Sequence, residues 1–126
     1  MPGQLEHVNY TVRDAVQTAK WLCELFDWQI RWQGPSLNDG HTVHVGSKSH
    51  YVALYNHGTP APSQEDNYAT IGGLNHIAVT VDDLDDTEQR VKAMGFTPQN
   101  HADYEPGRRF YFHDHDGIEY EVVQYD

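Results

Sequence analysis

Apolar and polar residues alternate in two similar segments of the chain. Residues 5–14 read LEHVNYTVRD, and residues 74–83, 69 positions later, read LNHIAVTVDD. Alternation with a period of two is typical of a β-strand with one buried face. In both segments an Asp follows the strand, where its side chain can accept backbone N–H groups at the start of a helix. The chain therefore contains a repeat in which each copy begins with a strand.

Each copy continues with an amphipathic helix and three short strands. Apolar residues follow Asp14 and Asp83 at steps of three and four, which predicts two helices, and Gly95 suits the left-handed position that ends the second. Stretches rich in β-formers, separated by Gly, Pro, Asn and Asp, predict strands at residues 29–33, 41–46, 49–55, 96–99, 108–113 and 118–124. The predicted fold is α+β, with two βαβββ modules that form curved mixed sheets. Module one covers residues 1–56, a linker residues 57–72, and module two residues 73–126.

The two repeated strands each carry a histidine on the face that is not apolar. In the first, His7 lies opposite Tyr10 and Val12, and in the second, His76 lies opposite Val79. The aliphatic face suits packing under the amphipathic helix. We therefore expect both histidines to point away from the helices.

The last predicted strand adds a carboxylate. Glu121 stands mid-strand between apolar neighbours, and a buried carboxylate is normally paired with a cation or a metal. Glu119 shares its face and is the more solvated alternative. Two imidazoles and one carboxylate leave open positions on a divalent ion, an arrangement associated with non-haem Fe(II), although Mn, Ni, Co or Zn also suit it. Because the histidine recurs in both copies, the sequence predicts a metal site formed by His7, His76 and Glu121.

Other residues are candidates for contacts with a substrate. The pair Arg108 and Arg109 could hold a substrate carboxylate by bidentate hydrogen bonds, although such a pair also suits a solvated strand start. Tyr55 and Tyr104 could line an apolar pocket, although aromatic residues in strands are often part of the core.

Composition narrows the class of partner. Eight Lys and Arg against nineteen Asp and Glu give a net charge of −11, which argues against nucleic acid or an anionic membrane surface as the main partner. The single cysteine, Cys23, excludes an intramolecular disulfide, and no apolar run reaches the roughly 18 residues of a membrane span. We expect a cytoplasmic protein whose partner is a small molecule.

The paired modules and their LEHVNY and LNHIAV segments resemble the vicinal oxygen chelate superfamily. That superfamily includes glyoxalase I, extradiol ring-cleaving dioxygenases, and fosfomycin and bleomycin resistance proteins. The resemblance implies the glyoxalase/bleomycin resistance/dihydroxybiphenyl dioxygenase fold, with metal ligands on the first strand of each module and on the last strand. His7, His76 and Glu121 fall at these places. The fourth ligand place of glyoxalase I, a carboxylate there, aligns with Ala53.

The C-terminal segment is similar to the signature of extradiol dioxygenases. His101 is followed by Phe110-Tyr111, then by Asp-His-Asp-Gly at residues 114–117, and then by Glu121. The resemblance implies that His101 is an active-site acid or base and that Tyr111 hydrogen bonds to substrate oxygens. The protein is thus expected to be a metal-dependent enzyme, dioxygenase-like, that acts on a small substrate with vicinal oxygens.

Two alternatives remain open: a glyoxalase-like lyase or isomerase, and a non-catalytic ligand-binding protein of the bleomycin-resistance kind. The family also implies a homodimer, whose metal sites lie either within one chain or across two.

Overall fold

The structure is a computed structural model that describes residues 1–62 and 66–126. The chain divides into two compact units, Met1–Pro62 (unit one) and Ser63–Asp126 (unit two). The boundary between them falls within the predicted linker, of which residues 63–65 lie outside the described residues.

Unit one contains a four-stranded sheet with one helix. Its elements are β1 (His7–Thr11), α1 (Ala15–Phe26), β2 (Gln29–Ser36), β3 (Gly40–Gly46) and β4 (Tyr51–Asn56). The strand order is β1-β4-β3-β2, in which β1 runs parallel to β4 and the other neighbours are antiparallel.

Unit two repeats this topology. Its elements are β5 (Ile77–Thr80), α2 (Leu84–Ala93), β6 (Gln99–Tyr104), β7 (Gly107–His113) and β8 (Glu119–Tyr125), in the strand order β5-β8-β7-β6. The predicted fold of two βαβββ modules is therefore confirmed. The strand predicted at 96–99 is wrong in its position, because Phe96 packs its ring on Phe112, 5.5 Å away between centroids, and pairing with β7 begins only at Gln99.

The helix boundaries follow the predicted signals. Asp14 accepts a hydrogen bond from the backbone of Gln17 at 3.1 Å, and Asp83 does the same for Asp86 at 3.0 Å. Each side chain satisfies a backbone donor that the first turn of a helix leaves unpaired. Gly95, with φ of 91°, follows the end of α2 in the left-handed conformation that glycine adopts without strain.

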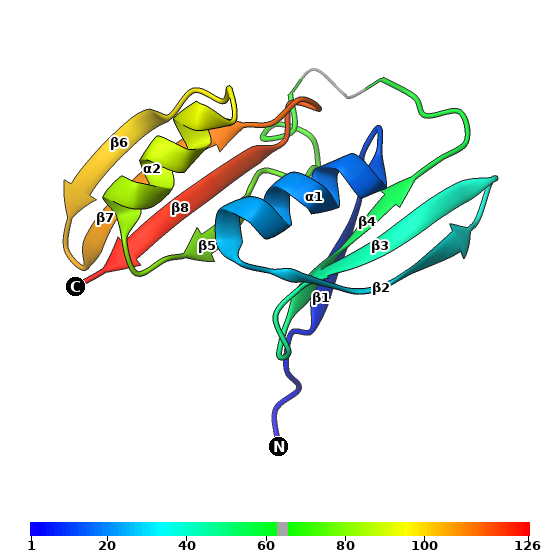
Figure 1. Ribbon diagram of the computed structural model, residues 1–126, viewed down its shortest axis with the longest axis horizontal. Coiled ribbons are helices and arrows are strands. Elements are labelled where there is room, and N and C mark those ends of the chain that lie inside the picture. Colours follow the sequence, from blue (N-terminus) through cyan, green and yellow to red (C-terminus); the bar gives the residue numbers. More distant parts are fainter. Residues whose placement is uncertain (63–65) are drawn as a thin grey trace. The chain divides into compact units, whose positions relative to one another are not determined.

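Each sheet buries one face under its own helix. In Figure 1, α1 lies across the sheet of unit one and α2 lies across the sheet of unit two. The fully buried side chains between each helix and its sheet include Leu22, Val43, Val45 and Leu54 in unit one, and Val91, Phe110, Phe112, Tyr120 and Val122 in unit two. The other face of each sheet is left to carry polar side chains. Neither helix is long and apolar enough to cross a membrane, as judged over the described residues.

Candidate functional site

The face of unit two that lies away from α2 brings His76 and Glu121 together. Glu121 lies in the middle of β8, in register with Ala78 of β5 and Tyr111 of β7. His76 directly precedes β5, and its Nε2 lies 3.3 Å from Oε1 of Glu121. Glu121 is only 7% exposed, so the cost of burying a carboxylate there has to be offset by neighbouring side chains.

Two further side chains hold the Glu121 carboxylate. Nη1 of Arg109 donates a hydrogen bond to its Oε2 at 3.2 Å, and Tyr111 is also hydrogen bonded to it. Burial and this hydrogen bond raise the pKa of the Tyr111 hydroxyl. The Arg109 guanidinium lies 4.8 Å from the centre of the Tyr104 ring. The structure thus brings five predicted site residues of unit two onto one face: His76, Glu121, Tyr111, Arg109 and Tyr104.

Glu119 and Tyr68 lie against the other nitrogen of His76. Nδ1 of His76 is 3.0 Å from the Tyr68 hydroxyl and 3.4 Å from Oε1 of Glu119. The Tyr68 hydroxyl donates a hydrogen bond to Glu119, and this bond raises the pKa of Tyr68 to about 12. Sequence reasoning missed Tyr68, because it lies in the loop before β5 and no strand pattern places it on a face.

In unit one, His7 lies at the start of a row of aromatic rings. Its ring stacks on Tyr51 at 4.8 Å between centroids, Tyr51 stacks on His44 at 4.7 Å, and His44 contacts Trp32 at 5.1 Å. Burial lowers the pKa of His44. Tyr55 lies further along β4, where its hydroxyl donates to the carbonyl of Leu37 at 2.8 Å, so this predicted substrate residue also ties down the turn between β2 and β3.

Comparison with known proteins identifies the family. The sequence matches the profile of the Glyoxalase/Bleomycin resistance protein/Dioxygenase superfamily over residues 4–122. The chain belongs to this superfamily. A comparison with curated proteins gave no significant match.

Solved structures of this superfamily share the fold at low sequence identity. A glyoxylase/bleomycin resistance protein/dioxygenase domain from Frankia sp. EAN1pec superposes with a TM-score of 0.83 at 23% identity, over 100% of this chain and 94% of that one. The fosfomycin resistance protein FosX from Listeria monocytogenes, solved with Mn(II) and sulfate, gives 0.76 at 19% identity over 100% and 95%. FosX from Mesorhizobium loti gives 0.70 at 23% identity over the same shares.

The side chains of His76 and Glu121 in unit two fit two ligand positions of a divalent metal site. Two ligand atoms about 2.1 Å from one ion lie roughly 3.0–3.4 Å apart, and His76 and Glu121 meet this at 3.3 Å. Glu119 faces the opposite ring nitrogen and does not converge with them. Within residues 1–62 and 66–126, no three His, Cys, Asp or Glu side chains form a group that could hold an ion. The geometry of this face therefore provides two donors.

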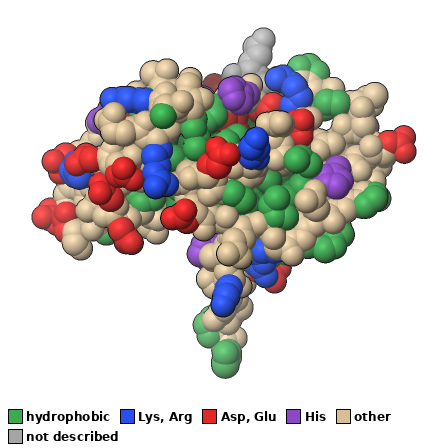
Figure 2. Space-filling view, viewed as in Figure 1, with side chains coloured by type: hydrophobic (Ala, Val, Ile, Leu, Met, Phe, Trp, Pro, Cys, Tyr) green, Lys and Arg blue, Asp and Glu red, His purple; other side chains and the backbone are tan. Residues whose placement is uncertain are grey.

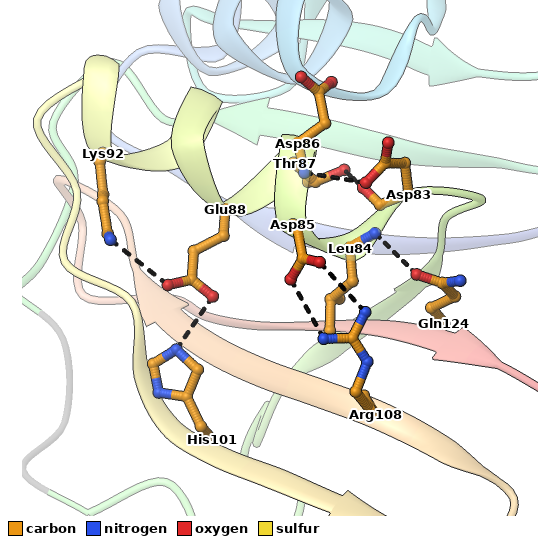
Figure 3. A network of polar contacts seen from close by, with 10 residues as sticks. All are labelled: Asp83, Leu84, Asp85, Asp86, Thr87, Glu88, Lys92, His101, Arg108 and Gln124. Atoms are coloured by element: carbon orange, nitrogen blue, oxygen red, sulfur yellow. Dashed lines mark hydrogen bonds and ion pairs between the residues drawn. The ribbon is translucent and has the colours of Figure 1, made fainter.

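The structure places His101 on the face of its sheet that is covered by α2. Nε2 of His101 lies 3.0 Å from Oε1 of Glu88 on α2, and its ring stacks on buried Phe110, so it faces the helix (Figure 3). The cause is a β-bulge: three steps along β6, from Gln99 to Ala102, match two steps along β7. The extra residue turns His101 to the face opposite the one that carries Glu121. His101 therefore does not share a face with His76 in this structure, and its role as an acid or base stays a prediction.

The predicted arginine pair is divided in the same way. Arg108 points to the helix side, where Nη1 lies 3.1 Å from Oδ1 of Asp85, and this hydrogen bond raises the pKa of Arg108 (Figure 3). Acidic and basic side chains lie next to one another on this side of the molecule, which Figure 2 shows in red and blue. Arg108 is thus part of a solvated ion-pair surface, and only Arg109 contacts Glu121.

Asp114 organises the turn between β7 and β8. Its Oδ1 accepts hydrogen bonds from the backbone of Asp116 at 2.9 Å and of Ile118 at 3.0 Å. Its Oδ2 is buried and has no hydrogen-bond partner among the described residues. Burial therefore raises the pKa of the Asp114 carboxyl, since the hydrogen bonds that favour its charged form do not outweigh the lost solvation.

This raised pKa gives a pH dependence with a defined sign. The folded state holds the Asp114 proton to a higher pH than the unfolded chain does, whose Asp pKa is about 3.9. The free energy of unfolding of the wild type, relative to Asp114→Asn, should fall as pH rises from about 3 through the raised pKa, and then stay level. Urea denaturation of both proteins across this range measures it. If the unfolding free energy of the wild type instead rose with pH relative to that of Asp114→Asn, the Asp114 carboxyl would not be buried with an unpaired oxygen.

Proposed function

We propose that the protein is a metal-dependent enzyme that binds a small substrate through two neighbouring oxygen atoms. The observation that carries the proposal is the approach of His76 Nε2 to Glu121 Oε1, 3.3 Å apart on the sheet face away from α2. His7, which the repeat places at the equivalent position of the first module, is the proposed third ligand, from this chain or from a second copy. Three protein ligands leave positions for substrate oxygens.

The donor types narrow the choice of metal to a few divalent ions. Imidazole and carboxylate ligands together suit Fe(II) and Mn(II), and also accept Ni, Co or Zn. The Mn(II) in FosX from Listeria monocytogenes supports a divalent ion that favours oxygen ligands. When bound, the metal would act as a Lewis acid that withdraws charge from the substrate oxygens. Around it, Arg109 and Tyr111 fix the Glu121 carboxylate, so that its Oε1 stays on the side of His76.

The reaction class is proposed from what the site face contains. An extradiol dioxygenase was predicted with His101 as its acid or base, but His101 is paired with Glu88 on the other face. We therefore favour Lewis-acid chemistry without O2 on a small oxygen-rich substrate, as in a glyoxalase-like lyase or isomerase. Dioxygenase activity is the alternative, and O2 consumption by the Fe(II)-loaded protein distinguishes the two.

The test compares two histidine variants. Protein purified without oxygen, and loaded with Mn(II) or Fe(II), is analysed for metal content as wild type, His76→Ala and His101→Ala. His101→Ala is the matched control, since it removes the same side chain from the opposite face of the same sheet. We expect the metal to be lost in His76→Ala and kept in His101→Ala, with both variants folded by circular dichroism.

Two outcomes would overturn the proposal. Equal metal content in both variants would show that His76 is not a ligand. A wild-type protein that takes up no divalent metal would instead support a ligand-binding protein of the bleomycin-resistance kind. The homodimer and the cytoplasmic location stay predictions, and the mass of the protein in solution tests the first.

A further inference from the structure

Both candidate histidine ligands have their Nδ1 atom against a carboxylate that also accepts a tyrosine hydroxyl. For His7 these partners are Glu6, 2.9 Å from Nδ1, and Tyr51, whose hydroxyl donates to Glu6 at 3.1 Å. For His76 they are Glu119 and Tyr68. The two arrangements are chemically alike but use non-equivalent positions of the repeat, so the duplication of the sequence alone does not account for them.

Hydrogen bonding in unit two determines which nitrogen of His76 carries the proton. A tyrosine has a single hydroxyl hydrogen, and that of Tyr68 is donated to the Glu119 carboxylate. The Tyr68 oxygen, 3.0 Å from Nδ1 of His76, is then available only as an acceptor. Nδ1 is therefore the donor towards Tyr68, so in the neutral ring the lone pair is on Nε2, on the side of Glu121.

The surroundings of Glu119 keep it an acceptor. Its Oε2 lies 3.6 Å from Nε2 of His113. Nδ1 of His113 lies 2.8 Å from the Gln99 amide nitrogen, which can only donate, so His113 carries its proton on Nε2 and turns it towards Glu119. Every described polar neighbour of Glu119 thus presents a hydrogen to it. With a side chain 14% exposed, Glu119 is largely shielded from competing water.

A turn holds Tyr68 in position. The backbone N–H of Ala69 donates to the side chain of Asp66 at 3.2 Å, and that of Gly73 donates to the carbonyl of Thr70 at 2.9 Å. Gly73 also passes so close to the backbone of this loop that a Cβ atom there would overlap it. The loop before β5 is therefore closed on itself, with Tyr68 directed at His76.

We infer that Tyr68 with Glu119, and Glu6 with Tyr51, are positioning pairs that hold His76 and His7 in the tautomer with the proton on Nδ1. Each histidine then offers the lone pair of Nε2 without first losing a proton or rotating its ring. A partner of this kind changes metal affinity by about 10- to 100-fold in other proteins. Only this last consequence rests on the proposed function, because the tautomer is a property of the metal-free protein.

The test measures the tautomer directly. Nitrogen NMR of the imidazoles in metal-free protein, recorded while the pH is raised until each ring is neutral, separates a protonated from an unprotonated ring nitrogen. We expect His76 and His7 of the wild type to carry the proton on Nδ1. Glu119→Leu should move the proton of His76 to Nε2, because the Tyr68 hydroxyl is then free to donate to Nδ1. Glu119→Gln should keep the wild-type tautomer, since its amide oxygen still accepts from Tyr68.

A matched control lies on the other face of the same sheet. Glu88→Leu removes the carboxylate beside His101 and should leave the His76 signals unchanged. Mn(II) affinity, measured by competition with a chelator, should fall by about 10- to 100-fold in Glu119→Leu, and by less than about 3-fold in Glu119→Gln and Glu88→Leu. Glu6→Leu should also shift the proton of His7 from Nδ1 towards Nε2, but to a smaller extent than Glu119→Leu shifts that of His76. The reason is that Glu6 is 63% exposed, so water can replace its carboxylate.

The outcomes separate this inference from the proposed function. A His76 proton on Nε2 in the wild type, or the same tautomer in the wild type and Glu119→Leu, would overturn the positioning role whatever the metal does. The expected tautomers in a protein that binds no Mn(II) would leave the positioning pairs intact and overturn the metal proposal alone.

Discussion

Glu121→Ala should abolish tight binding of Mn(II) and destabilise the folded protein at the same time. The first effect is expected because the variant removes one of the two donors that the structure brings within 3.3 Å of each other. Loss of a ligand should exceed the roughly 10- to 100-fold effect of removing an outer partner. Titration with Mn(II) in the presence of a competing chelator measures it.

The second effect follows from the Arg109 charge that remains. Its side chain is 14% exposed and that of Glu121 is 10% exposed, so the ion pair is largely buried. Removing one partner of such a pair leaves an uncompensated charge and costs roughly 3 kcal/mol of unfolding free energy. Stacking of the guanidinium over Tyr104 would offset only a small part of this cost. Urea denaturation gives the value.

A double variant separates the two effects. Glu121→Leu combined with Arg109→Leu removes both charges and should recover most of the lost stability, since buried ion pairs are often replaced by apolar residues at little cost. It should still bind no Mn(II). Restored metal binding in the double variant would show that Glu121 only neutralises Arg109 and is not a ligand.

The fold could be predicted because each copy of the repeat shows its strands and helix as patterns among residues close together in the sequence. Alternation in strands, apolar steps of three and four in helices, and the capping Asp14 and Asp83 each depend on neighbours in sequence, and each copy confirms the other. The same patterns place His7 and His76 correctly on the faces away from the helices. They also single out Glu121 as a buried carboxylate, which the structure bears out at 7% exposure.

His101 shows where face assignment by alternation fails. Counting from Gln99 by twos puts His101 on the face of Tyr111, with which Gln99 pairs. The bulge at Asn100, whose φ is 54°, inserts one residue into β6. His101 therefore lies on the sheet face opposite to the one that simple alternation gives it. Asn is one of the few residues other than glycine that often adopt a positive φ, but an Asn in the sequence is not enough to predict a bulge.

Tyr68 and Tyr51 could not be assigned from the sequence for a different reason. Their roles depend on contacts with Glu119 and Glu6, which join segments 51 and 45 positions apart. No local pattern encodes such a pairing. In addition, the two tyrosines do not occupy equivalent positions in the repeat, so comparing the two copies gives no signal either.

Phe112→Ala should be among the most destabilising single substitutions in the chain. The Phe112 ring is completely buried beneath α2, stacked between Phe96, 5.5 Å away, and Tyr120, 5.4 Å away between centroids. Truncating a buried Phe to Ala costs about 3–5 kcal/mol, from lost transfer free energy and the cavity that remains. That is a large share of the roughly 5–15 kcal/mol that holds a domain folded.

Thermal and urea denaturation would measure the loss, with a fall in melting temperature of roughly 10–20 °C for a chain of this size. Tyr125→Ala is the control, since Tyr125 is an aromatic residue of the same sheet but is 53% exposed, and it should cost less than about 1 kcal/mol. Equal losses in the two variants would mean that Phe112 is not packed in the core of unit two. The face that carries Glu121 would then lack the rigid support on which the separation of its donors depends.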